Sequence, residues 1–136
     1  MSSQETLPEL LRQRTNGRLM SRQVPKPWGH ELIWAETDRY VGKILHVKEG
    51  QALSLQYHEQ KDETIYILSG KLRFEYGPLD DSPLKEVILE PGDTFHITPH
   101  LRHRMIGASD CDVLEVSTPE LEDVVRLDDR YGRAGT

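Results

Sequence analysis

Short apolar runs separated by turn residues follow one another from Trp28 to Ser117. Within each run, apolar side chains alternate with polar ones or stand together over a few positions, and Gly, Pro or Asp often marks an end. Such a pattern is typical of β-strands that bury one face. It predicts about nine strands, at residues 32–34, 40–47, 52–57, 64–68, 72–76, 86–89, 94–98, 103–106 and 113–117. Many short strands at regular spacing favour an all-β, single-domain barrel or jelly roll.

The two ends of the chain have a different pattern. Residues 1–23 are polar without a sustained period, so we expect a partly flexible N-terminal arm with a short helix over residues 7–12. The barrel domain is then expected to cover residues 24–136. Near the other end, Thr118 precedes Pro119. A threonine N-cap followed by proline at the first helical position predicts a short C-terminal helix that reaches Arg126.

Length and charge narrow the class of protein. A chain of 136 residues is near the size of one domain and long enough to bury a core. The formal net charge of −6 argues against binding to nucleic acid or to a membrane surface, so a small molecule is the expected partner. Cys111 is the only cysteine, and the sequence contains no signal peptide and no long apolar span. We therefore expect a cytoplasmic protein.

Four side chains with metal-binding chemistry are expected to meet around one predicted hairpin. Gln56 and His58 are two residues apart, so on a strand they point to the same face. Glu63 begins the next apolar run, which a hairpin would fold back beside them, and His103 supplies a fourth group. Two imidazoles, one carboxylate and one amide oxygen suit zinc or another first-row divalent metal. Amide oxygen is a weak zinc ligand, and the alternative role for Gln56 is a hydrogen bond to a metal-bound water.

The same residues belong to two motifs that resemble those of a known family. The first cupin motif is matched at four positions: Gly50, His58, Glu63 and Gly70. At a fifth position, Gln56 replaces the family's first histidine. The second is matched by residues 91–95, Pro99, His103 and Arg104. Lys-Pro-Trp-Gly at residues 26–29 and Asp-Arg-Tyr-Gly-Arg at residues 129–133 are similar to the phosphomannose isomerase cupins. The resemblance covers residues 24–133 and implies a double-stranded β-helix that binds one divalent ion, zinc first, with Mn, Fe, Co or Ni as alternatives.

The resemblance implies an isomerase that interconverts mannose 6-phosphate and fructose 6-phosphate. In that family the cupin is often the C-terminal part of a bifunctional isomerase and mannose-1-phosphate guanylyltransferase. Because no nucleotidyltransferase domain precedes Lys26 here, we expect the guanylyltransferase activity to be absent. The chain also departs from the family pattern at residues 59–62, which replace a His-rich stretch, and before His103, where an expected glycine is missing. These departures leave the identity of the substrate open.

Isomerisation requires a base that moves a proton between two neighbouring carbons, in addition to a metal ion that polarises the carbonyl. Lys43, which aligns with a lysine of the family, is the first candidate base, and His100 is a second one; the alternative for Lys43 is an ordinary exposed strand lysine. Four residues are expected to bind the sugar phosphate, one by stacking and three by charge: Tyr57, Lys61, Arg104 and Arg126. Arginine suits phosphate because its planar fork binds two oxygens at once, although surface salt bridges would also explain both arginines.

Two other classes of function remain open from the sequence. One is a different metal-dependent cupin enzyme, either an oxygenase that uses two histidines and one carboxylate to hold iron, or another sugar isomerase. The other is a cupin that binds a sugar without turning it over. Whichever of the three functions applies, a homodimer is expected, by analogy with the pairing of cupins through their sheets.

Overall fold

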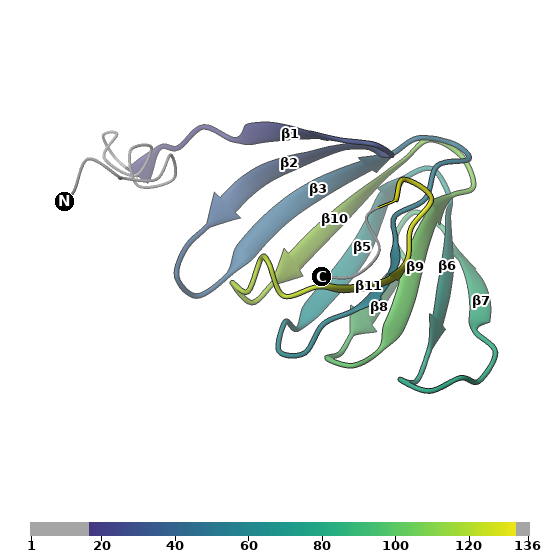
Figure 1. The fold of residues 1–136 in the computed structure, drawn as a ribbon. Helices are drawn as coiled ribbons and strands as arrows, with labels where there is room; N and C mark the ends of the chain where they lie inside the picture. Colours follow the sequence, from purple (N-terminus) through teal and green to yellow (C-terminus); the bar gives the residue numbers. More distant parts are fainter. Residues whose placement is uncertain (1–16, 133–136) are drawn as a thin grey trace.

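The computed structural model of the protein describes residues 17–132, and its regular structure consists of two antiparallel β-sheets (Figure 1). One sheet has six strands, in the order β1 (Arg22–Lys26), β2 (Gly29–Glu36), β3 (Val41–Val47), β10 (Cys111–Ser117), β5 (Glu63–Ser69) and β8 (Thr94–Ile97). The other has five strands, in the order β11 (Val125–Asp128), β4 (Leu55–Tyr57), β9 (Arg102–Gly107), β6 (Leu72–Gly77) and β7 (Lys85–Leu89). Non-consecutive strands lie side by side in both sheets, as in a jelly roll.

The core lies between the two sheets and is built by strict alternation along the strands. In β5, Ile65 and Ile67 are fully buried while Tyr66 and Leu68 face outward. Opposite them, Phe74 on β6 is the largest of the fully buried side chains of the core. Alternate residues of these strands therefore face the space between the sheets, which produces the two-layer arrangement.

The all-β jelly-roll prediction is confirmed, and each of the nine predicted runs contains or overlaps an observed strand. Two strands were missed: β1, which begins at Arg22 near the predicted domain boundary, and β11. Each is an edge strand that pairs with one neighbour, β1 with β2 and β11 with β4. Strand β1 has a single aliphatic residue, and the Val-Arg-Leu-Asp alternation of β11 follows the residues predicted to form a helix, so the tertiary pairing identifies both strands.

The turn between β5 and β6 requires the glycine at its centre. Gly70 has a φ of +74°, and a Cβ placed there would lie 2.0 Å from the backbone oxygen of Asp110. Both the left-handed conformation and the close approach of a second chain segment exclude a side chain at this position. The turn returns the chain to the opposite sheet and thereby fixes where β6 begins.

The predicted C-terminal helix is wrong. Residues 118–124 form turns and irregular backbone, and residues 125–128 form strand β11. Val125 and Arg126 pair with β4, while Asp123 hydrogen-bonds to the loop at residues 58–62. These tertiary contacts outweigh the local N-cap signal of Thr118 and Pro119. The helix predicted over residues 7–12 lies outside the described residues.

Within residues 17–132, the structure contains no helix with the length and apolar character needed to cross a bilayer.

Candidate metal centre

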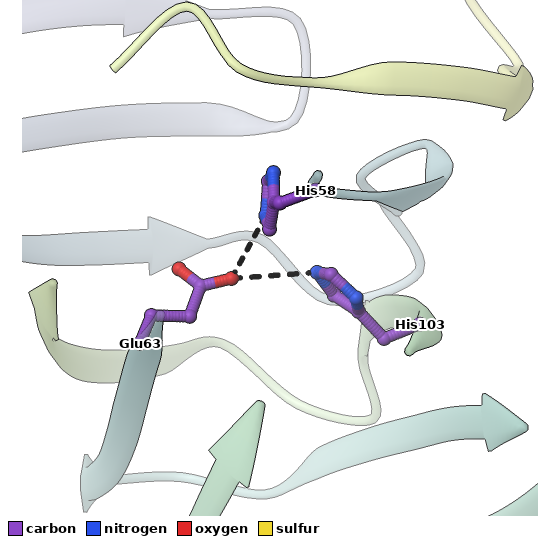
Figure 2. A group of neighbouring side chains, drawn as sticks. All are labelled: His58, Glu63 and His103. Carbon is purple, nitrogen blue, oxygen red and sulfur yellow. Dashed lines mark hydrogen bonds and ion pairs between the residues drawn. The ribbon is translucent and has the colours of Figure 1, made fainter. Parts of the chain in front are cut away.

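Three of the four predicted ligands converge inside the barrel (Figure 2). His58 directly follows β4, Glu63 is the first residue of β5, and His103 is the second residue of β9. Their exposed fractions are 2%, 3% and 1%, respectively, and one ligand atom from each lies within 4.8 Å of the others. Figure 2 shows both imidazoles directed at one carboxylate oxygen, with His58 Nε2 at 3.0 Å and His103 Nε2 at 3.5 Å from Glu63 Oε1.

Backbone carbonyls determine which ring nitrogen of each histidine faces this carboxylate with a lone pair. His58 Nδ1 donates to the carbonyl of Asp123, and His103 Nδ1 donates to the carbonyl of Leu101 at 2.9 Å. A carbonyl can only accept, so each Nδ1 carries the proton, and in the neutral ring each Nε2 presents a lone pair. His103 Nε2 is buried and has no hydrogen-bond partner in the described structure. Three acceptor atoms thus face one another.

The Glu63 carboxylate is held in its ionised form. Burial alone would raise the pKa of Glu63, but its contacts with the imidazoles of His103 and His58 and with the ammonium of Lys61 outweigh burial and hold that pKa well below its usual range. The three facing acceptors therefore need a cation between them, either a proton on one imidazole or a metal ion. Two neutral imidazoles held through Nδ1 and one carboxylate are a donor set that first-row divalent metals accept. The residues fit a metal ion.

Gln56, the fourth predicted ligand, lies next to this cluster. It is paired with His103 across β4 and β9, and its side chain faces the same cavity as His58. Its Oε1 accepts a hydrogen bond from Ser54 Oγ at 2.7 Å. Its role as a metal ligand stays a prediction.

A cavity of about 270 Å³ adjoins the cluster between the two sheets. His58 and Glu63 belong to its wall, while His103 is buried behind it. The rest of the wall mixes apolar side chains with charged ones: Val24, Lys26, Trp28, Glu31, Ile33, Lys43, Leu45, Leu53, Ser54, Gln56, Lys61, Met105, Glu115, Leu121, Val124 and Arg126. Such a mixture, with a few convergent polar groups, is what small-molecule sites share.

Two lysines in the cavity are neutralised by carboxylates. Lys43 Nζ lies 3.2 Å from Glu31 Oε1 across β2 and β3. Lys61 Nζ lies 3.4 Å from both Glu63 Oε2 and Glu115 Oε2. Burial opposes the charge on Lys61, but Glu115 and Glu63 outweigh it and raise the lysine's pKa. Burial and the neighbouring Glu63 charge raise the pKa of Glu115 to about 7, against the opposing charges of Lys61 and Lys43.

Two further cations of the cavity wall lack an acidic partner among residues 17–132. Arg126 on β11 and Lys26 on β1 form no ion pair within the described part of the chain, and Arg126 Nε is buried without a hydrogen-bond partner there. The two strands that carry them are the edges of different sheets. Unpaired cations facing a cavity leave room for an anionic group of a ligand.

Three predicted site residues lie away from the cavity wall. His100 is exposed, has a φ of +70°, and donates its backbone N–H to the carbonyl of His58. Arg104 donates to Asp128 Oδ2 at 2.8 Å, and Tyr57 on β4 points away from the face that Gln56 occupies. Among the described residues, none of the three lines the cavity, whereas Lys43, Lys61 and Arg126 do.

Sequence reasoning missed three acidic residues that the structure brings to the site: Glu31, Glu115 and Asp123. Glu115 had a readable signal, because it alternates with Val113 and Ser117 on the inward face of β10. Glu31 lies two residues before inward-facing Ile33 on β2, but the strand predicted at residues 32–34 did not include Glu31. Asp123 had none, since its neighbours were predicted to be helical.

Comparison with known proteins places these features in a family. Residues 43–117, more than half of the chain, match the cupin domain. ManC, a mannose-1-phosphate guanylyltransferase of Salmonella typhimurium, is 32% identical over 119 residues, which are 84% of this chain and 24% of that protein. The xanthan biosynthesis protein XanB of Xanthomonas campestris is 28% identical over 117 residues, 82% of this chain and 24% of that protein. The chain thus spans about a quarter of the length of the curated relatives it matches.

Solved structures support the same fold. The capsular polysaccharide assembling protein CapF of Staphylococcus aureus superposes with a TM-score of 0.68 at 18% identity, over 84% of this chain and 36% of CapF. KdgF from a Halomonas species superposes with a TM-score of 0.64 at 22% identity, over 79% of this chain and 93% of KdgF. At these identities the likeness concerns the fold alone. Together with the match of residues 43–117, the two facing sheets and the buried His-Glu-His cluster between them, it establishes that this chain belongs to the cupin family.

Proposed function

We propose that this protein is a metal-dependent isomerase of phosphorylated hexoses, interconverting mannose 6-phosphate and fructose 6-phosphate. The observation that carries the proposal is the buried His58–Glu63–His103 cluster at the wall of a cavity that is also lined by two cations without an ion pair among residues 17–132. The similarity to ManC, whose name states an activity on mannose 1-phosphate, favours a mannose phosphate over other small anions.

A divalent ion held by His58, Glu63 and His103 would polarise the sugar carbonyl and stabilise the enediolate oxygen. The chain itself must then move one proton. Glu31 lines the cavity with its carboxylate bound to Lys43, and its proposed role is to take the proton from C2 of the aldose and return it to C1. Lys43, the predicted base, keeps Glu31 in position and can donate a hydrogen bond to a substrate hydroxyl.

The phosphate group is proposed to bind to Arg126 and Lys26. Arg126, expected from the resemblance to contact phosphate, and Lys26 both line the cavity without acidic partners within the described part of the chain. Arginine offers two parallel N–H donors to phosphate oxygens, and lysine adds a point charge. Lys61, in contrast, is held between Glu63 and Glu115 and is left to balance the charge of the metal ligands.

The test is conversion of mannose 6-phosphate to fructose 6-phosphate by protein loaded separately with Zn, Mn, Co, Ni or Fe. His58→Ala is expected to lose bound metal and turnover while the far-ultraviolet circular dichroism stays that of a β-protein. His30→Ala, which removes an imidazole outside the cavity wall, is the matched control and should retain both. Unchanged metal stoichiometry in His58→Ala would overturn the site. No turnover with any metal, in protein that binds one, would overturn the isomerase.

A second candidate is an iron-dependent oxygenase, favoured by one contact. Ser54 Oγ already occupies one lone pair of Gln56 Oε1, so two histidines and one carboxylate are the ligands that the cluster offers without rearranging Gln56. That set with open positions is the one non-haem iron oxygenases use. Oxygen uptake by the Fe(II)-loaded protein in the presence of a sugar acid would support this candidate, and its absence would count against it.

We further propose a homodimer, because the outer face of the six-stranded sheet exposes large apolar side chains. Trp34, Tyr66, Leu68 and Val116 are each 40% exposed or more, and all belong to strands of that sheet. A second copy of the chain is the proposed cover of this face. Light scattering after size exclusion should give twice the mass of one chain, and Leu68→Arg should return a monomer; a monomeric wild type would refute the proposal.

A further inference from the structure

The segment between β10 and β11, residues 118–124, is hydrogen-bonded to the loop at residues 58–62 that follows β4. At its start, Thr118 N–H donates to the carbonyl of Asp62 at 3.0 Å, and Asp62 N–H donates back to Thr118 Oγ1 at 3.0 Å. The loop carries His58 at one end and leads directly into Glu63 at the other. The segment therefore contacts the part of the chain that sets the spacing of two metal ligands.

One carboxylate in this segment binds three consecutive backbone amides of that loop. Asp123 Oδ1 accepts from Glu59 N–H at 3.0 Å, and Asp123 Oδ2 accepts from Gln60 N–H at 2.6 Å and from Lys61 N–H at 2.8 Å. Three amides aimed at one ionised group form a compact anion-binding turn. Hydrogen bonds to an ionised group are stronger than neutral ones, so this contact fixes the path of the backbone between His58 and Glu63.

The same residue holds the ring of the first ligand. The backbone carbonyl of Asp123 accepts the hydrogen bond from His58 Nδ1. This bond places the proton on Nδ1 and the lone pair on Nε2, the atom 3.0 Å from Glu63 Oε1. If residues 118–124 moved, the loop and the imidazole would therefore lose their orientation together.

We propose that Asp123 is a positioning residue for the metal centre. Its carboxylate anchors residues 59–61, and that anchor keeps its own carbonyl in place to orient His58 Nε2 toward Glu63 and His103. This inference rests on the metal site of the proposed function but not on the reaction. Leu121 and Val124 of the same segment line the cavity, so a molecule bound there touches the segment that orients the ligand.

The experiment compares Asp123→Asn and Asp123→Ala with Glu122→Gln, which removes a charge from an exposed neighbour in the same segment. Zn²⁺ affinity is measured by competition with a chelator, and the Co²⁺-loaded protein is compared by its visible absorption spectrum. We expect Zn²⁺ affinity to fall about 10- to 100-fold in both Asp123 variants, as for other groups that orient metal ligands, with an altered Co²⁺ spectrum. Glu122→Gln should match the wild type.

A measurement without metal separates this inference from the proposed function. In the apo protein, ¹⁵N shifts of the His58 ring should report the Nδ1–H tautomer in wild type and Glu122→Gln, and a mixture of tautomers in Asp123→Ala. If the wild type binds no Zn²⁺ while the His58 tautomer still differs between wild type and Asp123→Ala, the metal site is overturned and Asp123 keeps its role in orienting His58. An Asp123→Ala variant that is less stable, yet keeps the tautomer and the Zn²⁺ affinity of the wild type, would overturn the inference.

Discussion

Replacing Glu63 with glutamine should remove metal-dependent stabilisation while leaving the apo protein folded. The substitution keeps the volume of the side chain and changes one oxygen into an N–H donor. In the apo protein that donor would face His58 Nε2 and His103 Nε2, which lie 3.0 and 3.5 Å from Glu63 Oε1 in the wild type. A contact between lone pairs is thus converted into a hydrogen bond.

The expected magnitudes follow from these contacts. The new hydrogen bond contributes about 1 kcal/mol. The substitution also removes the Glu63 carboxylate, one of the two that Lys61 Nζ contacts at 3.4 Å, and this loss destabilises the variant. The Glu115 carboxylate remains. Because that lysine keeps a buried counter-ion, we expect the free energy of unfolding of the apo variant to stay within about 2 kcal/mol of the wild type. A metal at about 1,000 times its dissociation constant stabilises the wild type by about 4 kcal/mol. For a domain of this size that raises the melting temperature by roughly 10 to 15 °C.

The assay is differential scanning calorimetry of both proteins with and without excess Zn²⁺ or Mn²⁺. The wild type should show the shift, and Glu63→Gln should show less than a third of it with an apo melting temperature close to that of the wild type. Equal metal-induced shifts in the two proteins would refute the assignment of Glu63 as a ligand. An apo variant that fails to fold would refute the reasoning about facing lone pairs.

Three further predictions concern the core, a turn and a buried thiol. Phe74→Ala should lower the free energy of unfolding by about 3–5 kcal/mol, measured by urea denaturation, because a fully buried ring leaves a cavity; a loss below about 1 kcal/mol would contradict the packing described. Gly70→Ala should leave little soluble protein, since its Cβ would meet Asp110 O at 2.0 Å, whereas Gly50→Ala, with a similar positive φ but open space around it, should express and unfold closer to the wild type. Burial, aided by the neighbouring Asp112 and Asp110, raises the pKa of Cys111 to about 11. Because the unfolded thiol ionises first, stability should fall between about pH 9 and pH 11, and Cys111→Ser should show a smaller fall in its urea midpoint over that window; identical profiles would contradict it.

The strands of the fold were predictable because short apolar runs or alternations end at turn residues. The run Ile65–Leu68 ends before Gly70 and predicts β5, and Leu72 and Phe74 alternate with charged residues in β6. Strand β11 has only four residues, and its Val-Arg-Leu-Asp alternation was overlooked because the N-cap signal of Thr118 predicted a helix that reached Arg126. Its pairing with β4 is a tertiary contact that the local sequence does not report.

The residues of the candidate site also differ in whether the sequence alone predicts their position. His58 and Glu63 are close in sequence, and motif spacing was enough to predict that they meet. His103 arrives from β9 through the cupin motif. Asp123 could not be found this way, because its role depends on amides 59–61 and a carbonyl contact across 65 residues of sequence. To predict that role, one must first know that β5 follows the loop at residues 58–62 and that β11 pairs with β4.

The pairing of β4 has a consequence for how the barrel opens. This strand has three residues, shares a single register pair with β9, and has β11, an edge strand, on its other side. Glu63 and His103, in contrast, lie on strands that each share six register pairs with one neighbour, β5 with β10 and β9 with β6. Backbone amides of β11 should therefore exchange with deuterated water well before those of β5 and β10, since separating an edge strand costs less free energy than global unfolding. A ligand could enter by fraying that edge, while Glu63 and His103 stay in place.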